Sequence, residues 1–154
     1  MTIQRYSTDK YFIEVAKIVA KRSTCLRRQV GAVLVKEKRI LSTGYNGAPS
    51  GMPHCNLERC YRSRKQISSG KDLDYCYAVH AEANCLIQAA IHGTSILGKT
   101  TLYVTLFPCI SCLKMILNAK IHRIVYLEGY PDKNPIKKRL LSEASLVVEE
   151  FTKK

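Results

Sequence analysis

The spacing of apolar residues divides the chain into alternating helices and strands. Residues 7–24 carry apolar side chains at helical spacing, and Ser7 or Thr8 can cap the resulting helix. The stretches VGAVLV (30–35) and RILSTGY (39–45) are typical of strands, and the charged turn between them indicates a hairpin. The first third of the chain therefore predicts one helix followed by two paired strands.

The second half of the chain continues the alternation. Helical patterns cover residues 80–93, 108–120 and 134–144, and strand patterns cover 100–107, 123–128 and 146–151. In the first of these helices we expect four residues to face inward, namely Ala83, Leu86, Ile87 and Ala90. Helices that alternate with strands after a hairpin predict a three-layer α/β/α sandwich around a central mixed five-stranded sheet.

Residues 46–77 are the one long stretch without a hydrophobic period. They carry glycine, proline, serine, charged residues and three of the seven cysteines. A loop of this length inside a compact domain is expected to have a function or to be held by a cross-link such as a bound metal. The chain shows no internal repeat and no linker, so we expect a single domain over residues 1–154 with a stapled insertion at about 46–78.

Composition and charge narrow the class of protein. The longest apolar stretches are too short to span a bilayer, and the start of the chain lacks the apolar core of a signal peptide, so we expect a cytoplasmic protein with no membrane partner. In a reducing compartment, clustered cysteines are metal ligands or catalytic groups more often than disulfides. The net charge of +13 favours anionic partners, although a solvated basic surface explains it equally well.

Two of the predicted helices begin with residues that bind metals. His80 opens one helix, and Cys109 and Cys112 lie one turn apart at the start of another. One imidazole and two thiolates suit a catalytic zinc whose fourth position holds water, and helix N-termini stabilise thiolates. Zinc lowers the pKa of that water toward neutrality. Glu82, in the first helical turn, is then placed as the catalytic proton carrier rather than as a ligand.

The motif H-x-E followed by P-C-x-x-C is typical of zinc nucleobase deaminases. Here it reads HAE at residues 80–82 and PCISC at residues 108–112. The alternative is an unrelated C-x-x-C beside a glutamate that caps a helix. The combination at two predicted helix starts favours the deaminase interpretation.

From about Arg22 to Tyr130 the chain resembles deoxycytidylate deaminases, including the forms encoded in bacterial competence operons. The resemblance rests on these pieces: STCLRRQVGAVLV, STGYNGAPSGMPHC, HAEANCLIQAA, TLYVTLFPCISCLKMI and RIVYLEGY. It implies a cytidine-deaminase-like fold and a zinc-dependent hydrolase that converts dCMP and water to dUMP and ammonia, which feeds dTTP synthesis. It also implies that zinc-activated water attacks C4 of cytosine while Glu82 protonates N3 and then the leaving amino group.

The same resemblance implies which residues surround the substrate. It implies that Val30, Gly31 and Ala32 form part of the floor of the base pocket. It also implies that Asn46 holds the sugar or base, that Asn84 helps to shape the site, and that Tyr130 contacts the nucleotide. Simpler interpretations stay open for two of them. Asn46 could be a plain turn residue before a glycine, and Tyr130 a packed loop aromatic.

The substrate phosphate requires cationic side chains or backbone N–H donors. Arg27 and Arg28 are the candidates, because they precede the strand at Val30 that borders the expected pocket. A solvated basic turn is an equally good interpretation of these two arginines.

Four further cysteines surround the aperiodic stretch: Cys25, Cys55, Cys60 and Cys76. Four thiolates complete a closed structural zinc site, which would staple the insertion. The resemblance implies the same, since related phage and bacterial enzymes carry an extra zinc at positions that match Cys25 and Cys55. His54 could replace one cysteine, and separate reduced thiols are the alternative. Cys85 lies on the inward side of a helix, so we expect it to pack in the core.

Two other functions compete with this interpretation. A tRNA adenosine deaminase or another nucleic-acid deaminase suits the basic charge, but the GYNGAPSG stretch argues against it, so we do not expect a nucleic-acid partner. A DNA-uptake or DNA-binding module on a deaminase fold would not need the acid–base residue Glu82. The resemblance further implies a homo-oligomer, specifically a hexamer, and allows control by dCTP and dTTP, with Mg²⁺ accompanying the allosteric nucleotide.

Overall fold

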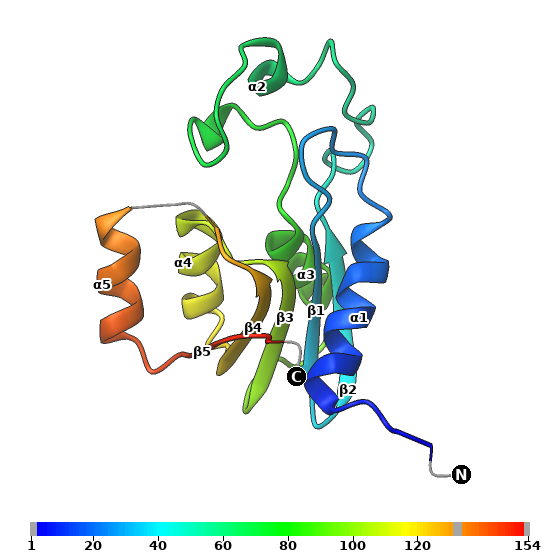
Figure 1. The fold of residues 1–154 in the computed structure, drawn as a ribbon, viewed down its shortest axis with the longest axis vertical. Coiled ribbons are helices and arrows are strands. Elements are labelled where there is room, and N and C mark those ends of the chain that lie inside the picture. The colour runs from blue at the N-terminus through cyan, green and yellow to red at the C-terminus, as the bar shows by residue number, and fades with distance from the viewer. Residues whose placement is uncertain (1–2, 131–133, 153–154) are drawn as a thin grey trace.

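The structure is a computed structural model that describes residues 3–130 and 134–152 (Figure 1). The elements along these residues are α1 (Thr8–Ala20), β1 (Gly31–Lys36), β2 (Arg39–Tyr45), α2 (Tyr61–Arg64), the 3₁₀ turn η1 (Leu73–Tyr75), α3 (Ala81–Ile91), β3 (Thr100–Leu106), α4 (Ile110–Asn118), β4 (Arg123–Glu128), α5 (Pro135–Glu143) and β5 (Val147–Glu150). Ser7 caps α1, because its hydroxyl accepts a hydrogen bond from the Lys10 N–H.

The five strands form one mixed sheet in the order β2-β1-β3-β4-β5. Strand β1 runs antiparallel to both β2 and β3, whereas β3, β4 and β5 run parallel to one another. Glu37 and Lys38 join β1 to β2 with positive φ angles of 51° and 62°, as a two-residue hairpin turn requires. Parallel neighbours need crossover connections, which α4 and α5 supply.

Helices cover both faces of the sheet, which confirms the predicted three layers (Figure 1). On one face α1 buries Phe12, Ile13 and Ala16 against the sheet. On the other face α3 and α4 form the larger core together with residues of β1 and β3, and α5 adds partly buried leucines to it. The two helices that carry the metal-binding motif therefore lie on the same side of the sheet.

The predicted inward face of α3 is wrong for two of its four residues. Ile87 and Ala90 are exposed, and the helix instead buries Ala81, Cys85 and Ala89. These small residues face the sheet because α3 approaches β2 very closely. A Cβ atom added to Gly44 of β2 would lie 2.3 Å from the carbonyl oxygen of Ala81, so only glycine fits there.

Residues 46–77 form an excursion beyond the ends of β1 and β3, and α2 lies within it (Figure 1). Its base is closed by Gly47 and Val79, whose backbone groups exchange hydrogen bonds of 2.8 and 3.1 Å. The chain then enters α3 directly, so this excursion overhangs the start of that helix. None of the helices in the described residues has the length and apolar character needed to traverse a lipid bilayer.

Candidate active site

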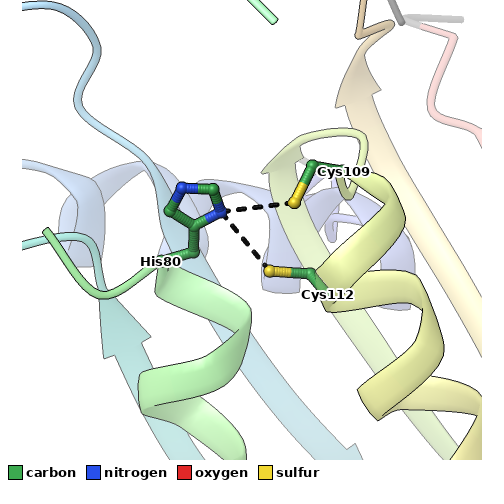
Figure 2. Close-up of side chains that lie close together, drawn as sticks. All are labelled: His80, Cys109 and Cys112. Atoms are coloured by element: carbon green, nitrogen blue, oxygen red, sulfur yellow. Dashed lines mark hydrogen bonds between the residues drawn. The ribbon is translucent and has the colours of Figure 1, made fainter. Parts of the chain in front are cut away.

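His80, Cys109 and Cys112 converge at one point between α3 and α4 (Figure 2). The Nδ1 atom of His80 lies 3.4 Å from the Sγ atom of Cys109 and 3.5 Å from that of Cys112. Within the described parts of the chain, this is the one group of three such residues whose ligand atoms all lie within 4.8 Å of one another. The structure thus brings together the three ligands predicted from the sequence.

Helix geometry explains why these side chains meet. His80 is the N-cap residue of α3 and Cys109 is that of α4, and neither side chain caps its own helix. Both side chains are therefore available to a ligand, and Cys112 joins them from the first turn of α4. The positive end of the α4 dipole favours thiolates at this position.

The separations of the three ligand atoms fit zinc. With Zn–S and Zn–N bonds of about 2.3 and 2.0 Å, tetrahedral angles place nitrogen and sulfur about 3.5 Å apart. The two N···S distances in the structure match this value. Zinc commonly binds imidazole and thiolate ligands, and three protein ligands leave the fourth position for water or substrate.

Hydrogen bonds and nearby charges shift the pKa values of His80 and Cys109. Hydrogen bonds with Cys109 and with Cys76 raise the pKa of His80 to about 10. The pKa of Cys109 is lowered, first by a hydrogen bond with Cys112 and then by the one with His80. These shifts favour a thiolate at Cys109 paired with an imidazolium at His80, so metal binding needs the Cys109 thiolate as it is and releases a proton from His80.

Glu82 lies beside the three ligands without being one of them. Its side chain is buried, and burial raises the pKa of its carboxyl group to about 7. Its electrostatic neighbours include His80, Cys109 and Cys112. A buried carboxyl group next to a metal position can exchange protons with water and substrate.

A cavity of about 410 Å³ opens over this group, and its wall includes His80, Glu82 and Cys109. The overhanging residues 55–77 supply much of the opposite wall, and Leu106 and Phe107 supply apolar surface at the end of β3. A cavity of this size that combines apolar surface with a few polar groups is typical of a small-molecule site.

Five of the predicted substrate-binding residues line this cavity: Arg27, Arg28, Val30, Asn46 and Tyr130. Asn46 is buried, its Oδ1 accepts a hydrogen bond from the Val30 N–H, and its Nδ2 donates to the Arg28 carbonyl. One amide hydrogen and one lone pair of Asn46 are left for a ligand. The roles of all five residues stay predictions.

Three other predicted residues lie away from the cavity wall. Gly31 packs against α1, where an added Cβ would lie 2.1 Å from the Ala16 carbonyl oxygen. Ala32 belongs to the main core. Asn84 donates a hydrogen bond to the carbonyl of Tyr45, so it ties α3 to the end of β2. Their contributions to the substrate site stay predictions.

The four cysteines of the proposed second zinc site all line the same cavity: Cys25, Cys55, Cys60 and Cys76. They are free thiols, and no three of them come within the 4.8 Å that the first group satisfies. Burial raises the pKa of Cys55, and the charges of the other three raise it further. His54 is exposed and is not part of the cavity wall. Cys85 is fully buried, as predicted.

Arg62 is a cavity residue that the sequence did not reveal. It lies in α2, between Arg59 and Arg64, and nothing in the pattern of this aperiodic stretch distinguishes it from those two. In the structure it is buried whereas both neighbours are exposed. The difference depends on how residues 46–77 fold over the site, which no hydrophobic period encodes.

Comparisons with known proteins agree with this geometry. Residues 6–128 match the model of the cytidine and deoxycytidylate deaminase zinc-binding region. A deoxycytidylate deaminase of Schizosaccharomyces pombe is 42% identical over 127 residues, and the match covers 82% of this chain and 38% of the yeast protein. A deoxycytidylate deaminase of Mycobacterium phage D29 is 41% identical over 129 residues, which cover 80% of this chain and 97% of the phage protein.

A solved structure extends the similarity to the whole fold. The dCMP deaminase of cyanophage S-TIM5, in complex with dCMP and dUMP, aligns with a TM-score of 0.74 and 26% identity. The alignment covers 97% of this chain and all of the phage chain. The present chain thus spans 97% of one phage relative and all of the other, but less than half the length of the S. pombe relative.

Proposed function

This chain belongs to the cytidine and deoxycytidylate deaminase family, and from this premise we propose that it hydrolyses dCMP to dUMP and ammonia. The dUMP formed would supply dTTP synthesis. The observation that carries the proposal is the convergence of His80, Cys109 and Cys112 beside the buried Glu82, on the wall of a cavity.

The residues of the site divide the chemistry among them. His80, Cys109 and Cys112 would hold a zinc ion, which would supply the Lewis acidity that makes water a nucleophile at neutral pH. Glu82 takes a proton from that water as its oxygen bonds to C4 of cytosine, and delivers the proton to N3. Glu82 then takes the second proton, from the hydroxyl group now on C4, and delivers it to the amino group, so that the C4–N4 bond breaks, ammonia leaves and the C4 carbonyl forms. Leu106 and Phe107 provide apolar wall on the same cavity.

The choice of dCMP rests on the relatives and on charge. The curated relatives described above are named deoxycytidylate deaminases, and the S-TIM5 protein binds dCMP and dUMP. Arg27, Arg28 and Arg62 line the cavity, and Glu82 is its one carboxylate among the described residues. A cavity with this excess of positive charge suits a nucleotide better than an uncharged nucleoside.

A substrate panel tests the proposal. Zinc-loaded protein is assayed for ammonia release from dCMP, CMP, dCTP, deoxycytidine and a tRNA anticodon stem-loop. We expect kcat/KM to be highest for dCMP and the stem-loop to be inert. Higher turnover of the stem-loop adenosine, or equal kcat/KM for deoxycytidine and dCMP, would contradict the assignment.

We also propose a second, structural zinc held by Cys25, Cys55, Cys60 and Cys76. Support comes from their shared cavity and from the mutual effect of their charges on Cys55. Four thiolates are a common donor set of structural zinc sites. Metal binding would draw the four sulfur atoms together and fasten residues 46–77 over the active site, because the free energy of binding is coupled to folding.

Metal counting separates the two sites. We expect two zinc ions per chain in the parent, one in Cys60→Ser and one in Cys109→Ala. Cys60→Ser should lower the melting temperature, whereas Cys109→Ala should abolish turnover. A parent protein with one zinc per chain, and Cys60→Ser as stable as the parent, would show that these cysteines are ordinary thiols.

Assembly and regulation remain predictions of the family resemblance. They comprise a homo-hexamer, control by dCTP and dTTP with Mg²⁺ as companion ion, and a cytoplasmic location. Light scattering gives the mass of the assembly, and initial rates with each nucleotide, with and without Mg²⁺, report the control.

A further inference from the structure

Arg62 is an unusual arginine because it is buried and, among the described residues, has no carboxylate partner. The residue is 7% exposed. One terminal nitrogen donates a hydrogen bond of 3.2 Å to the carbonyl oxygen of Ser68. The Nε atom is buried and has no hydrogen-bond partner in the described part of the chain. A guanidinium group carries five N–H donors, and burying a cation with unused donors costs free energy.

The position of Arg62 indicates what could use these donors. It lines the cavity that also contains His80 and Glu82. The thiol of Cys76 is within hydrogen-bonding reach of both Arg62 and His80. Arg62 and His80 therefore lie on either side of the Cys76 thiol, and all three residues line the cavity that a ligand would enter.

The other two arginines of the cavity are already engaged. Arg27 donates a hydrogen bond to the carbonyl oxygen of Ile67. Arg28 is exposed, and its guanidinium lies 3.9 Å from the carboxylate of Glu128. Neither has the burial and the unpaired donor that Arg62 combines. A dianionic group brought into the cavity would therefore gain most from Arg62.

We propose that Arg62 binds the phosphate monoester of the nucleotide substrate and thereby selects a nucleoside monophosphate over a nucleoside. This inference rests on the proposed function and deepens it. The phosphate oxygens accept hydrogen bonds from Nε and the adjacent terminal nitrogen, a planar pairing for which guanidinium is suited. Arg27 and Arg28 then add positive charge around the entrance.

Arg62→Gln and Arg64→Gln form a matched pair of variants. Both remove one positive charge from α2, but Arg64 is exposed, and its guanidinium donates to the Glu58 carbonyl instead of lining the cavity. Two readouts are measured on zinc-loaded protein. The first is the ratio of kcat/KM for dCMP to that for deoxycytidine, and the second is the affinity for inorganic phosphate by calorimetry.

Hydrogen bonds to charged groups contribute about 1.5–3 kcal/mol, which corresponds to about 10- to 100-fold. We therefore expect Arg62→Gln to lower the dCMP-to-deoxycytidine ratio and the phosphate affinity each by about 10- to 100-fold. Arg62→Lys, which keeps the charge but not the Nε–H, should fall between Arg62→Gln and the parent. Arg64→Gln should match the parent in both readouts.

Several outcomes would overturn the inference. They are an unchanged ratio in Arg62→Gln, an equal loss of dCMP and deoxycytidine turnover, loss of bound zinc, or failure of both Arg62 variants to fold while Arg64→Gln folds. The last three would assign Arg62 a structural role. The phosphate readout keeps the test separate from the reaction: a parent that deaminates none of the cytosine substrates but binds phosphate through Arg62 would refute the proposed function and retain this inference.

Discussion

The carboxyl group of Glu82 occupies the second position of α3, two residues after the metal ligand His80. Its burial at 4% exposure is unusual for a glutamate, because a charged group is normally left in water. Helix geometry directs it toward the same point as His80 and Cys112, with which it interacts electrostatically. This position beside the three candidate ligands supports the proposed role of Glu82, which is to carry protons without binding the metal.

Glu82→Gln keeps the shape of this side chain and removes its ability to carry a proton. We expect kcat on dCMP to fall by about 10²- to 10⁴-fold, because general acid–base catalysis contributes this much. Zinc content and melting temperature should stay close to those of the parent, since Glu82 is not a ligand. Steady-state rates and elemental analysis on the same sample measure both.

The exposed Glu58→Gln serves as a matched control, because it removes a carboxylate that does not line the cavity. Turnover by Glu82→Gln at the rate of this control would refute the assigned role.

At the scale of elements, one ionic network fastens α1 to the sheet. The guanidinium of Arg123 on β4 donates two hydrogen bonds, of 2.9 and 2.8 Å, to the carboxylate of Asp9 on α1. The Tyr103 hydroxyl donates to the same carboxylate over 2.7 Å, and Arg123 also pairs with Glu149 of β5. Asp9 thus connects α1 with β3 through Tyr103, and with β4 and β5 through Arg123.

This network predicts a pH dependence of stability. The hydrogen bond from Arg123 lowers the pKa of Asp9 in the folded protein. The contribution of Asp9 is therefore complete above the unfolded value of about 3.9 and is lost as pH falls through the lower folded value. Asp9→Asn should reduce the free energy of unfolding at pH 7 by about 1 kcal/mol, a figure that allows for partial exposure of the carboxylate.

Denaturant titrations at pH 7 and at pH 3 measure this difference, which should shrink at the lower pH. Glu143→Gln is the control, because Glu143 pairs with Arg139 where both side chains are exposed, and such pairs contribute little. A gap between Asp9→Asn and the parent that stays constant over this pH range would show that the network does not act through ionisation.

At the scale of the whole molecule, the sequence predicts the parts that depend on periodicity and motif spacing. The five strands, the three layers and the His80, Cys109 and Cys112 group follow from hydrophobic period and from ligands at helix starts. The inward face of α3 could not be predicted as well. Its small residues face the sheet because of the close approach at Gly44, which is a property of tertiary packing.

Residues 46–77 mark the limit of such prediction. Without a hydrophobic period, nothing in the sequence indicates that Arg62 is buried while Arg64 is exposed. Sequence adjacency to Val30 indicates Arg27 and Arg28, whereas the fold adds Arg62 from a distant segment to the same cavity. Residues that a long loop contributes to a site become visible only in three dimensions.

The central claim is that this fold hydrolyses dCMP with a zinc ion held by His80, Cys109 and Cys112. The most direct measurement is dCMP turnover by metal-depleted protein as zinc is added back. We expect no dUMP from the depleted protein, and turnover that rises with zinc occupancy in the parent but not in Cys109→Ala. Formation of dUMP at an undiminished rate without metal, or none by the fully zinc-loaded parent, would contradict the claim.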